Sequence, residues 1–175
     1  TIRVQDDGSF VFEADSEHVP KMLKALGLEG CNTVVSPGTK ERLAEEEWAL
    51  DSREASVYRA VVARGNYLSQ DHLDIRFVVK ELCQRMSRPT NVDMLRLKRL
   101  CRYLAGAPRV VQGESAVVCD DAIDVFVDAD WGGDTKHRRS VTGFIIKLAG
   151  GTIYYKTRFQ KSIALSSTEA EFSAA

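Results

Sequence analysis

The chain has 175 residues, of which 44% are hydrophobic, and its formal net charge is −1. This length can bury the core of one domain or of two small ones, and the near-neutral charge excludes a globally basic nucleic-acid-binding protein. No apolar run approaches the roughly 20 residues of a membrane span, and no signal peptide opens the sequence. We therefore expect no membrane partner and an intracellular location, in the cytoplasm or the nucleus. The four cysteines form no C-x-x-C pair, which indicates small core residues in a reducing compartment.

The first part of the sequence predicts a hairpin, a helix and a linker. Residues 1–14, TIRVQDDGSFVFEA, resemble two strands joined by a turn at Asp7-Gly8. A short helix follows, with Ser16 as its expected cap, Gly27 at its end, and one apolar face made of Val19, Met22, Leu23 and Leu26. Residues 32–47, NTVVSPGTKERLAEEE, have the Pro-Gly pair and the charge run of a linker.

Three helices are predicted next from apolar residues at helical spacing. The first contains Val57, Tyr58, Val61, Val62 and Leu68. The second stops before Pro89 and contains Ile75, Val78, Val79, Leu82 and Met86. The third ends at residues 106–108, GAP, and contains Leu97, Leu100, Cys101 and Leu104. Arg96, Arg99 and Arg102 lie off the apolar stripe of this third helix, where they form either a basic ridge or simply its solvated side.

Charge is distributed unevenly along the chain. Residues 80–109 hold eight basic and two acidic side chains, whereas residues 110–134 hold seven acidic side chains and no Lys or Arg. Adjacent blocks of opposite sign indicate a binding surface beside a cation site. The simpler alternative is two solvated faces that adjoin in the sequence.

After residue 115 the hydrophobic period changes from that of helices to that of strands. Residues 122–131, AIDVFVDADW, place Ile123, Val125, Val127 and Ala129 on one face and Asp124, Phe126, Asp128 and Asp130 on the other. Residues 140–150 and 152–159 predict two more strands, joined by a tight turn at Gly150-Gly151. Residues 164–175, ALSSTEAEFSAA, open a helix. A three-stranded meander followed by a helix, after a helical segment, predicts an α+β fold.

The aspartate pair in this strand admits three interpretations: a solvated edge strand, a calcium loop, or a metal site that handles phosphates. Asp128 and Asp130 share one face, and close like charges repel unless a cation or water intervenes. The spacing does not fit a calcium loop, which needs an oxygen ligand at nearly every second position. Mg²⁺ prefers carboxylate ligands completed by substrate phosphate oxygens. The solvated strand and the metal site both remain open on this motif alone.

The final helix offers a second carboxylate for such a site. Ser166 and Glu169 have the spacing of a capping box, so Glu169 is expected to act locally at the helix start. Glu171 has no such local role and is placed to face the sheet. A strand aspartate together with a first-helix glutamate is the nucleus of a two-metal nuclease site.

These motifs resemble those of a known family. DADWGGDTKHRRSVTGF (residues 128–144) and QKSIALSSTEAEF (residues 160–172) are similar to the ribonuclease H domain of copia-type retrotransposon Pol polyproteins. Residues 58–109 resemble the helical segment between reverse transcriptase and ribonuclease H, and residues 16–40 the stretch after the polymerase palm. The resemblance implies two domains: a thumb- or connection-like C-terminal segment of reverse transcriptase at 1–114, and the N-terminal part of a truncated ribonuclease H-like domain at 115–175.

The resemblance also assigns roles to individual residues. Asp128 matches a catalytic metal-binding aspartate and Glu171 a catalytic metal-binding glutamate, with Asp130 as a supporting metal ligand. It implies two Mg²⁺ (or Mn²⁺) ions about 4 Å apart and an RNA–DNA hybrid as substrate, recognised by shape and 2′-hydroxyls. Arg138 and Arg139, in the turn after Asp134, are expected to contact the nucleic-acid backbone, and Arg96, Arg99 and Arg102 to hold phosphates. His137 is expected to be a solvated loop residue.

Where the sequence departs from the family pattern, the expectations change. The Y-x-D-D polymerase motif is absent, so we expect no polymerase activity from this chain. Two further carboxylates of the family would lie beyond Ala175, so the rest of the Pol polyprotein is an expected partner and the chain alone is expected to be weakly active or inactive. Two other hypotheses remain: a catalytically inert remnant that binds nucleic acid through its basic helix, and a structural scaffold.

Overall fold

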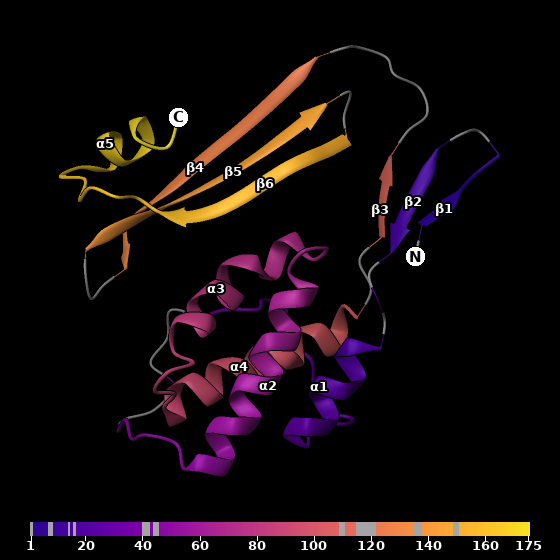
Figure 1. Cartoon of the computed structure of the whole chain (residues 1–175), viewed down its shortest axis with the longest axis vertical. Helices are drawn as coiled ribbons and strands as arrows, with labels where there is room; N and C mark the ends of the chain where they lie inside the picture. The colour runs from indigo at the N-terminus through magenta and orange to yellow at the C-terminus, as the bar shows by residue number, and fades with distance from the viewer. Residues whose placement is uncertain are drawn as a thin grey trace. The chain divides into compact units, whose positions relative to one another are not determined.

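The computed structural model describes residues 2–6, 9–13, 15, 17–39, 43, 46–108, 111–114, 122–134, 138–148 and 151–175. The chain divides into two compact units, which we call the helical unit (Phe12–Gln112) and the sheet unit (Ile2–Val11 with Gly113–Ala175). Helices and antiparallel strands occur in separate runs along the chain (Figure 1), which confirms the predicted α+β class. No helix in the described part of the chain is both long and apolar enough to cross a membrane.

A small sheet contains the two strands of the predicted N-terminal hairpin. Its strands β1 (Ile2–Val4), β2 (Phe10–Glu13) and β3 (Val111–Glu114) lie in the order β1-β2-β3. The two hairpin strands are confirmed, whereas their predicted turn, Asp7-Gly8, lies outside the described residues. Strand β3 was not predicted, because only one of its four residues, Val111, is a strand former and its partner lies about a hundred positions earlier in the chain.

Helix α1 (His18–Leu26) opens the helical unit. Val19 and Met22 are buried, and Leu23 and Leu26 pack against the same core, which confirms the predicted apolar face. Gly27 ends the helix in the left-handed region at φ 62°, where a residue without a Cβ is favoured. The expected cap, Ser16, lies outside the described residues, and the first flanking residue, Glu17, makes no side-chain cap.

The three predicted helices are confirmed as α2 (Ser52–Leu68), α3 (Arg76–Gln84) and α4 (Asn91–Gly106), with a short 3₁₀ helix η1 (Leu73–Ile75) before α3. Capping boxes start α2 at Asp51 and α4 at Thr90. Together with α1, these elements bury one core: Val19, Met22, Tyr58, Val61, Val62, Leu68, Ile75, Val78, Val79, Leu82, Leu97, Leu100, Cys101 and Leu104. Cys101 is buried in this core, as expected, and the burial raises the pKa of its thiol to about 12.

The predicted linker is fastened to helix α4 at two places. Arg99 donates from Nε to the Gly38 carbonyl (3.1 Å) and from Nη2 to the Ser36 hydroxyl (3.3 Å), and Arg102 donates from Nε to the Asn32 carbonyl (2.7 Å). Near the start of α4, the Asn91 side chain bonds the Trp48 N–H and the Glu46 carbonyl. The linker has no regular helix where it is described, yet the carbonyls of Asn32, Gly38 and Glu46 each have a side-chain donor from α4.

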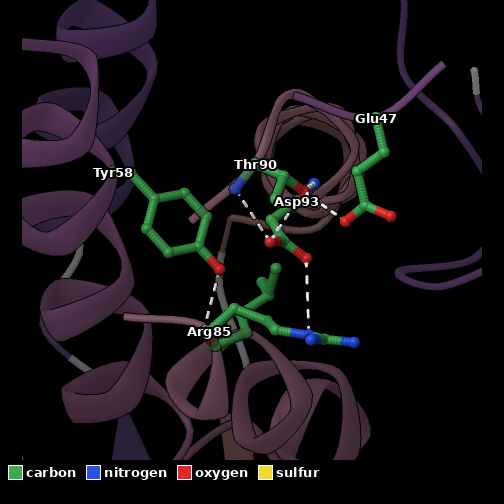
Figure 2. Close-up of polar contacts among 6 residues, drawn as sticks. Glu47, Tyr58, Arg85, Thr90 and Asp93 are labelled. Carbon is green, nitrogen blue, oxygen red and sulfur yellow. Dashed lines mark hydrogen bonds and ion pairs between the residues drawn. The ribbon is translucent and has the colours of Figure 1, made fainter. Parts of the chain in front are cut away.

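A polar cluster lies between α2, α3 and the start of α4 (Figure 2). The Tyr58 hydroxyl donates to the Leu82 carbonyl at 2.8 Å, and burial, with the nearby Asp93 carboxylate, raises the Tyr58 pKa. Asp93 is 2% exposed, and it accepts from the Thr90 N–H at 2.9 Å and faces Arg85 Nε at 3.9 Å. The Thr90 hydroxyl lies 2.9 Å from Glu47 Oε1 and 3.0 Å from Asp93 Oδ2. These bonds satisfy polar groups that would otherwise be costly to bury.

The sheet unit contains the predicted meander. Strands β4 (Ile123–Asp134), β5 (Arg139–Leu148) and β6 (Gly151–Phe159) are antiparallel neighbours in the order β4-β5-β6. Helix α5 (Ser167–Phe172) packs against β4 and β5 (Figure 1). The three strands and the final helix are thus confirmed, while Gly150 of the predicted turn lies outside the described residues.

We expect Tyr58→Phe to lower the free energy of unfolding by about 1–3 kcal/mol, because the buried Leu82 carbonyl loses its donor. Urea unfolding at neutral pH measures this loss. Tyr67→Phe is the matched control, since that ring is 50% exposed, and it should change stability by less than about 0.5 kcal/mol. Equal stability of the two variants would contradict the role of the Tyr58 hydroxyl.

We expect Arg102→Gln to speed amide hydrogen exchange in residues 31–38, because the Asn32 carbonyl loses its charged donor. Exchange in the core of α2 should stay unchanged. Arg96→Gln is the control on the same helix, since the Arg96 side chain makes none of the hydrogen bonds that join α4 to residues 32–38 in the described part of the chain. The interpretation is wrong if both variants leave the exchange of residues 31–38 at the wild-type rate.

Candidate functional site

The aspartate pair lies on β4, on one face, as the alternation predicts. In the antiparallel register Asp128 lies opposite Gly143 of β5, and Asp130 lies opposite Val141. Both aspartates are exposed. Within the described ranges, neither carboxylate makes a hydrogen bond or an ion pair with another side chain.

Two glycines shape the surroundings of these carboxylates. A Cβ added at Gly143 would meet nothing within 4 Å, so the position opposite Asp128 is open space. A Cβ added at Gly133 would instead collide with the Asp130 carboxylate, so that side chain lies directly over the glycine. The register shifts between Asp130 and Asp134, with Gly132 at φ 64°. This shift interrupts the regular pairing of β4 with β5 directly after the aspartate pair.

The predicted glutamate lies on helix α5. Ser166 caps the helix by accepting from the Glu169 N–H at 3.1 Å, and Glu169 in turn accepts from the Leu165 N–H at 2.7 Å. Glu169 thus has the expected local role at the helix start. Its carboxylate accepts from the Leu165 N–H, whereas in a capping box it would accept from the N–H of the cap residue, Ser166. Glu171 is exposed, and its carboxylate has no hydrogen-bond or ion-pair partner among the residues described. The fold brings the helix of Glu171 against the strand of Asp128.

Two residues that tie this helix to the sheet were not singled out from the sequence. Trp131 donates from Nε1 to the Ala164 carbonyl at 3.0 Å, just before α5. Gln160 is 6% exposed and donates from Nε2 to the Thr142 hydroxyl at 3.0 Å and to the Ala170 carbonyl at 2.7 Å. Gln160 follows a strand directly, and a polar residue there is typical of an exposed loop, so the periodic pattern gave no signal of its burial.

The arginines expected to contact nucleic acid differ in their surroundings. Arg138 and Arg139 are exposed in the turn that leads into β5, where Arg138 adopts a left-handed φ of 59° and Arg139 lies opposite Asp134. On α4, Arg99 and Arg102 bond the linker carbonyls, whereas Arg96 makes no such bond to the described linker. The phosphate-binding role of all five stays a prediction. His137 lies outside the described residues.

The carboxylates of β4 form only part of a metal centre. The described ranges contain no group of three or more His, Cys, Asp or Glu side chains that could hold a metal ion. Asp128 and Asp130 supply hard carboxylate oxygens on one face beside open space, which is the kind of partial donor set that Mg²⁺ accepts when substrate oxygens complete its coordination. The residues present fit a divalent cation but do not enclose one.

No protein-family model and no solved structure matches the chain. The chain is 29% identical over 176 residues to an uncharacterised mitochondrial protein of Arabidopsis thaliana, covering 99% of the chain and 71% of that protein. It is 33% and 35% identical, over 144 and 119 residues, to the retrovirus-related Pol polyproteins from transposons RE1 and RE2 of the same plant.

The coverage of the two Pol polyproteins is uneven. The matches cover 80% and 66% of this chain but only 9% and 8% of the polyproteins. The similarity therefore extends over most of the chain. The match to the uncharacterised mitochondrial protein covers 99% of the chain, so it includes both the helical unit and the sheet unit. The chain belongs to the Pol polyprotein family of copia-type retrotransposons.

Proposed function

We propose that the chain contributes to a ribonuclease H-type, metal-dependent nuclease that hydrolyses the RNA strand of RNA–DNA hybrids. The observation that carries this proposal is the setting of Asp128. Its carboxylate is exposed and lies opposite a glycine that leaves open space, on the strand against which the helix of Glu171 packs. In this proposal the sheet unit is the first part of a ribonuclease H-like domain, and the helical unit is a thumb- or connection-like segment of reverse transcriptase.

The side chains of the site have distinct roles in this proposal. Asp128 and Glu171 are the catalytic metal ligands and Asp130 is a supporting ligand. When bound, Mg²⁺ or Mn²⁺ lowers the pKa of a water molecule and neutralises charge on the scissile phosphate. Asp128 and Asp130 share a face, so a cation near them also relieves the repulsion between their negative charges. Gly143 leaves room beside Asp128 for a sugar–phosphate backbone.

Substrate binding in this proposal depends on shape and charge. A hybrid duplex is recognised through its groove geometry and 2′-hydroxyls, with sequence-independent phosphate contacts that weaken as salt rises. Arg138 and Arg139 are exposed near the site and are the favoured phosphate contacts, followed by Arg96. Arg99 and Arg102 already donate to linker carbonyls, which makes them weaker candidates. The remaining carboxylates of the site would come from another part of the Pol polyprotein.

Cleavage of a labelled RNA–DNA hybrid in MgCl₂ tests this function. The chain is assayed alone and joined to the residues that follow the matching segment in the transposon RE1 polyprotein. We expect cutting by the joined chain, and we expect Asp128→Asn to slow it by about 100-fold or more, since even outer-shell partners of metals are worth 10–100-fold.

Asp124→Asn is the matched control, because Asp124 lies on the same face of β4, opposite Lys147, and has no assigned role. It should cut at the wild-type rate. Cutting by Asp128→Asn at the rate of this control would contradict the proposal. Salt-sensitive hybrid binding without cutting would favour an inert nucleic-acid-binding role, and the absence of both would favour a scaffold.

A further inference from the structure

Strand β6 carries one aromatic and two cationic side chains on a single face. Tyr154, Lys156 and Arg158 are exposed and occupy alternate positions of the strand. Lys156 lies opposite Phe144 of β5, and Arg158 lies opposite Thr142, in the stretch where β5 and β6 pair regularly. Because the side chains of a strand alternate between two faces, the three exposed residues point to the same side of the sheet. We call these three residues the β6 stripe.

The β6 stripe lies on the opposite side of the sheet from the aspartate pair. The rings of Tyr154 and Phe144 are in contact, with 5.6 Å between their centroids, so they share a face. Phe144 is in turn the register partner of Val127 on β4. Val127 and Asp128 are neighbours in the strand and therefore point to opposite faces. The stripe is thus a surface separate from the candidate metal site.

The two faces of this sheet differ in charge. On β4, the carboxylates of Asp124, Asp128 and Asp130 all lie on one face. Among the described residues of β4, β5 and β6, the opposite face carries no carboxylate, and its charged groups are Lys156 and Arg158. Neither cation makes a hydrogen bond or an ion pair within the part of the chain that the structure describes. Two such cations on one face favour an anionic partner.

The spacing of the stripe suits an extended polyanion with unpaired bases. Alternate residues of a strand lie about 6.6–6.8 Å apart, so Lys156 and Arg158 are placed to meet separate phosphates of one extended strand. Tyr154 follows in the same row, and it is 49% exposed while its ring rests against Phe144. A supported, exposed aromatic ring beside cations that follow the backbone is the combination that binds single strands. A duplex keeps its bases stacked on one another and offers the tyrosine none.

We infer that the β6 stripe binds single-stranded nucleic acid, with Lys156 and Arg158 on phosphates and Tyr154 stacked on a base. The inference goes beyond the proposed function and does not rest on the metal site. Hydrolysis of the RNA strand of a hybrid leaves the DNA strand unpaired, so the product of the proposed reaction belongs to the class of ligand that the stripe fits.

Fluorescence anisotropy of labelled oligothymidine and oligouridine tests the inference on the 175-residue chain. The buffer contains EDTA, so a failure of the proposed metal site does not affect the result. We expect the single strands to bind, and a DNA duplex of equal length to bind at least about five-fold more weakly, because stacking on the tyrosine is lost. Binding of either single strand supports the inference, and the ratio of the two affinities shows which sugar is preferred.

Two variants separate the contributions of charge and stacking. The double variant Lys156→Gln, Arg158→Gln removes two phosphate contacts, so the plot of log K against log salt should become shallower by about 1.4, at about 0.7 for each contact with a single strand. Tyr154→Leu should weaken binding about ten-fold and leave that slope unchanged. The matched controls, which should bind as wild type, change exposed residues of the helical unit: Lys24→Gln with Arg53→Gln, and Tyr67→Leu.

The double variant changes only exposed side chains, so it keeps the inference testable if Tyr154→Leu does not fold. The inference is overturned if neither single strand binds the wild-type chain, or if the variants bind as their controls do. A shallower slope with no effect of Tyr154→Leu indicates a general attraction of anions and also overturns it. So does a dimer, seen by analytical ultracentrifugation, that the variants dissociate, because a second copy of the chain then occupies the stripe.

Discussion

The antiparallel pairing of β4 with β5 is the constraint on which the candidate site depends. The side-chain period of a strand is two, so Asp128 and Asp130 must share a face once β4 is paired. The register then determines what lies beside them: a glycine opposite Asp128 and a buried valine opposite Asp130. A slip of one residue would move both carboxylates to the other face and place them beside different partners. The chemistry proposed for the site therefore begins with backbone hydrogen bonds.

The helical unit shows that a basic block in a sequence can also serve contacts within the fold. Residues 80–109 are strongly basic, and such a block suggests a surface for an acidic partner. In the structure, Arg99 and Arg102 bond carbonyls of residues 32–38, and Arg85 faces the buried Asp93 carboxylate. Arginine suits these tasks because its planar group offers several directed donors. Three of the eight basic side chains of this block thus make contacts inside the unit.

The elements of this fold that could be predicted are those whose signal is local. The apolar faces of the helices and the glycine at the end of α1 can each be read within a window of about ten residues, and the structure confirms them. The strand β4 is confirmed as well, whereas Ile123 and Val125 of its predicted apolar face are more than half exposed. The residues that were missed act over long separations. Arg102 bonds a carbonyl 70 positions away, and Gln160 joins Thr142, 18 positions before it, to Ala170, 10 positions after it. Such contacts follow from the packing of whole elements, which no local pattern contains.

The surface of β4 has a consequence for how the chain behaves in solution. Ile123, Val125 and Phe126 are each more than half exposed, and they point alternately to both sides of the strand. In the described residues β4 pairs with β5 along one edge only, so its other edge presents free backbone groups. The net charge of −1 gives little colloidal repulsion between molecules. This strand is therefore one place where molecules can associate, and covering it, whether by another part of a polyprotein or by a mild detergent, should raise the solubility of the chain.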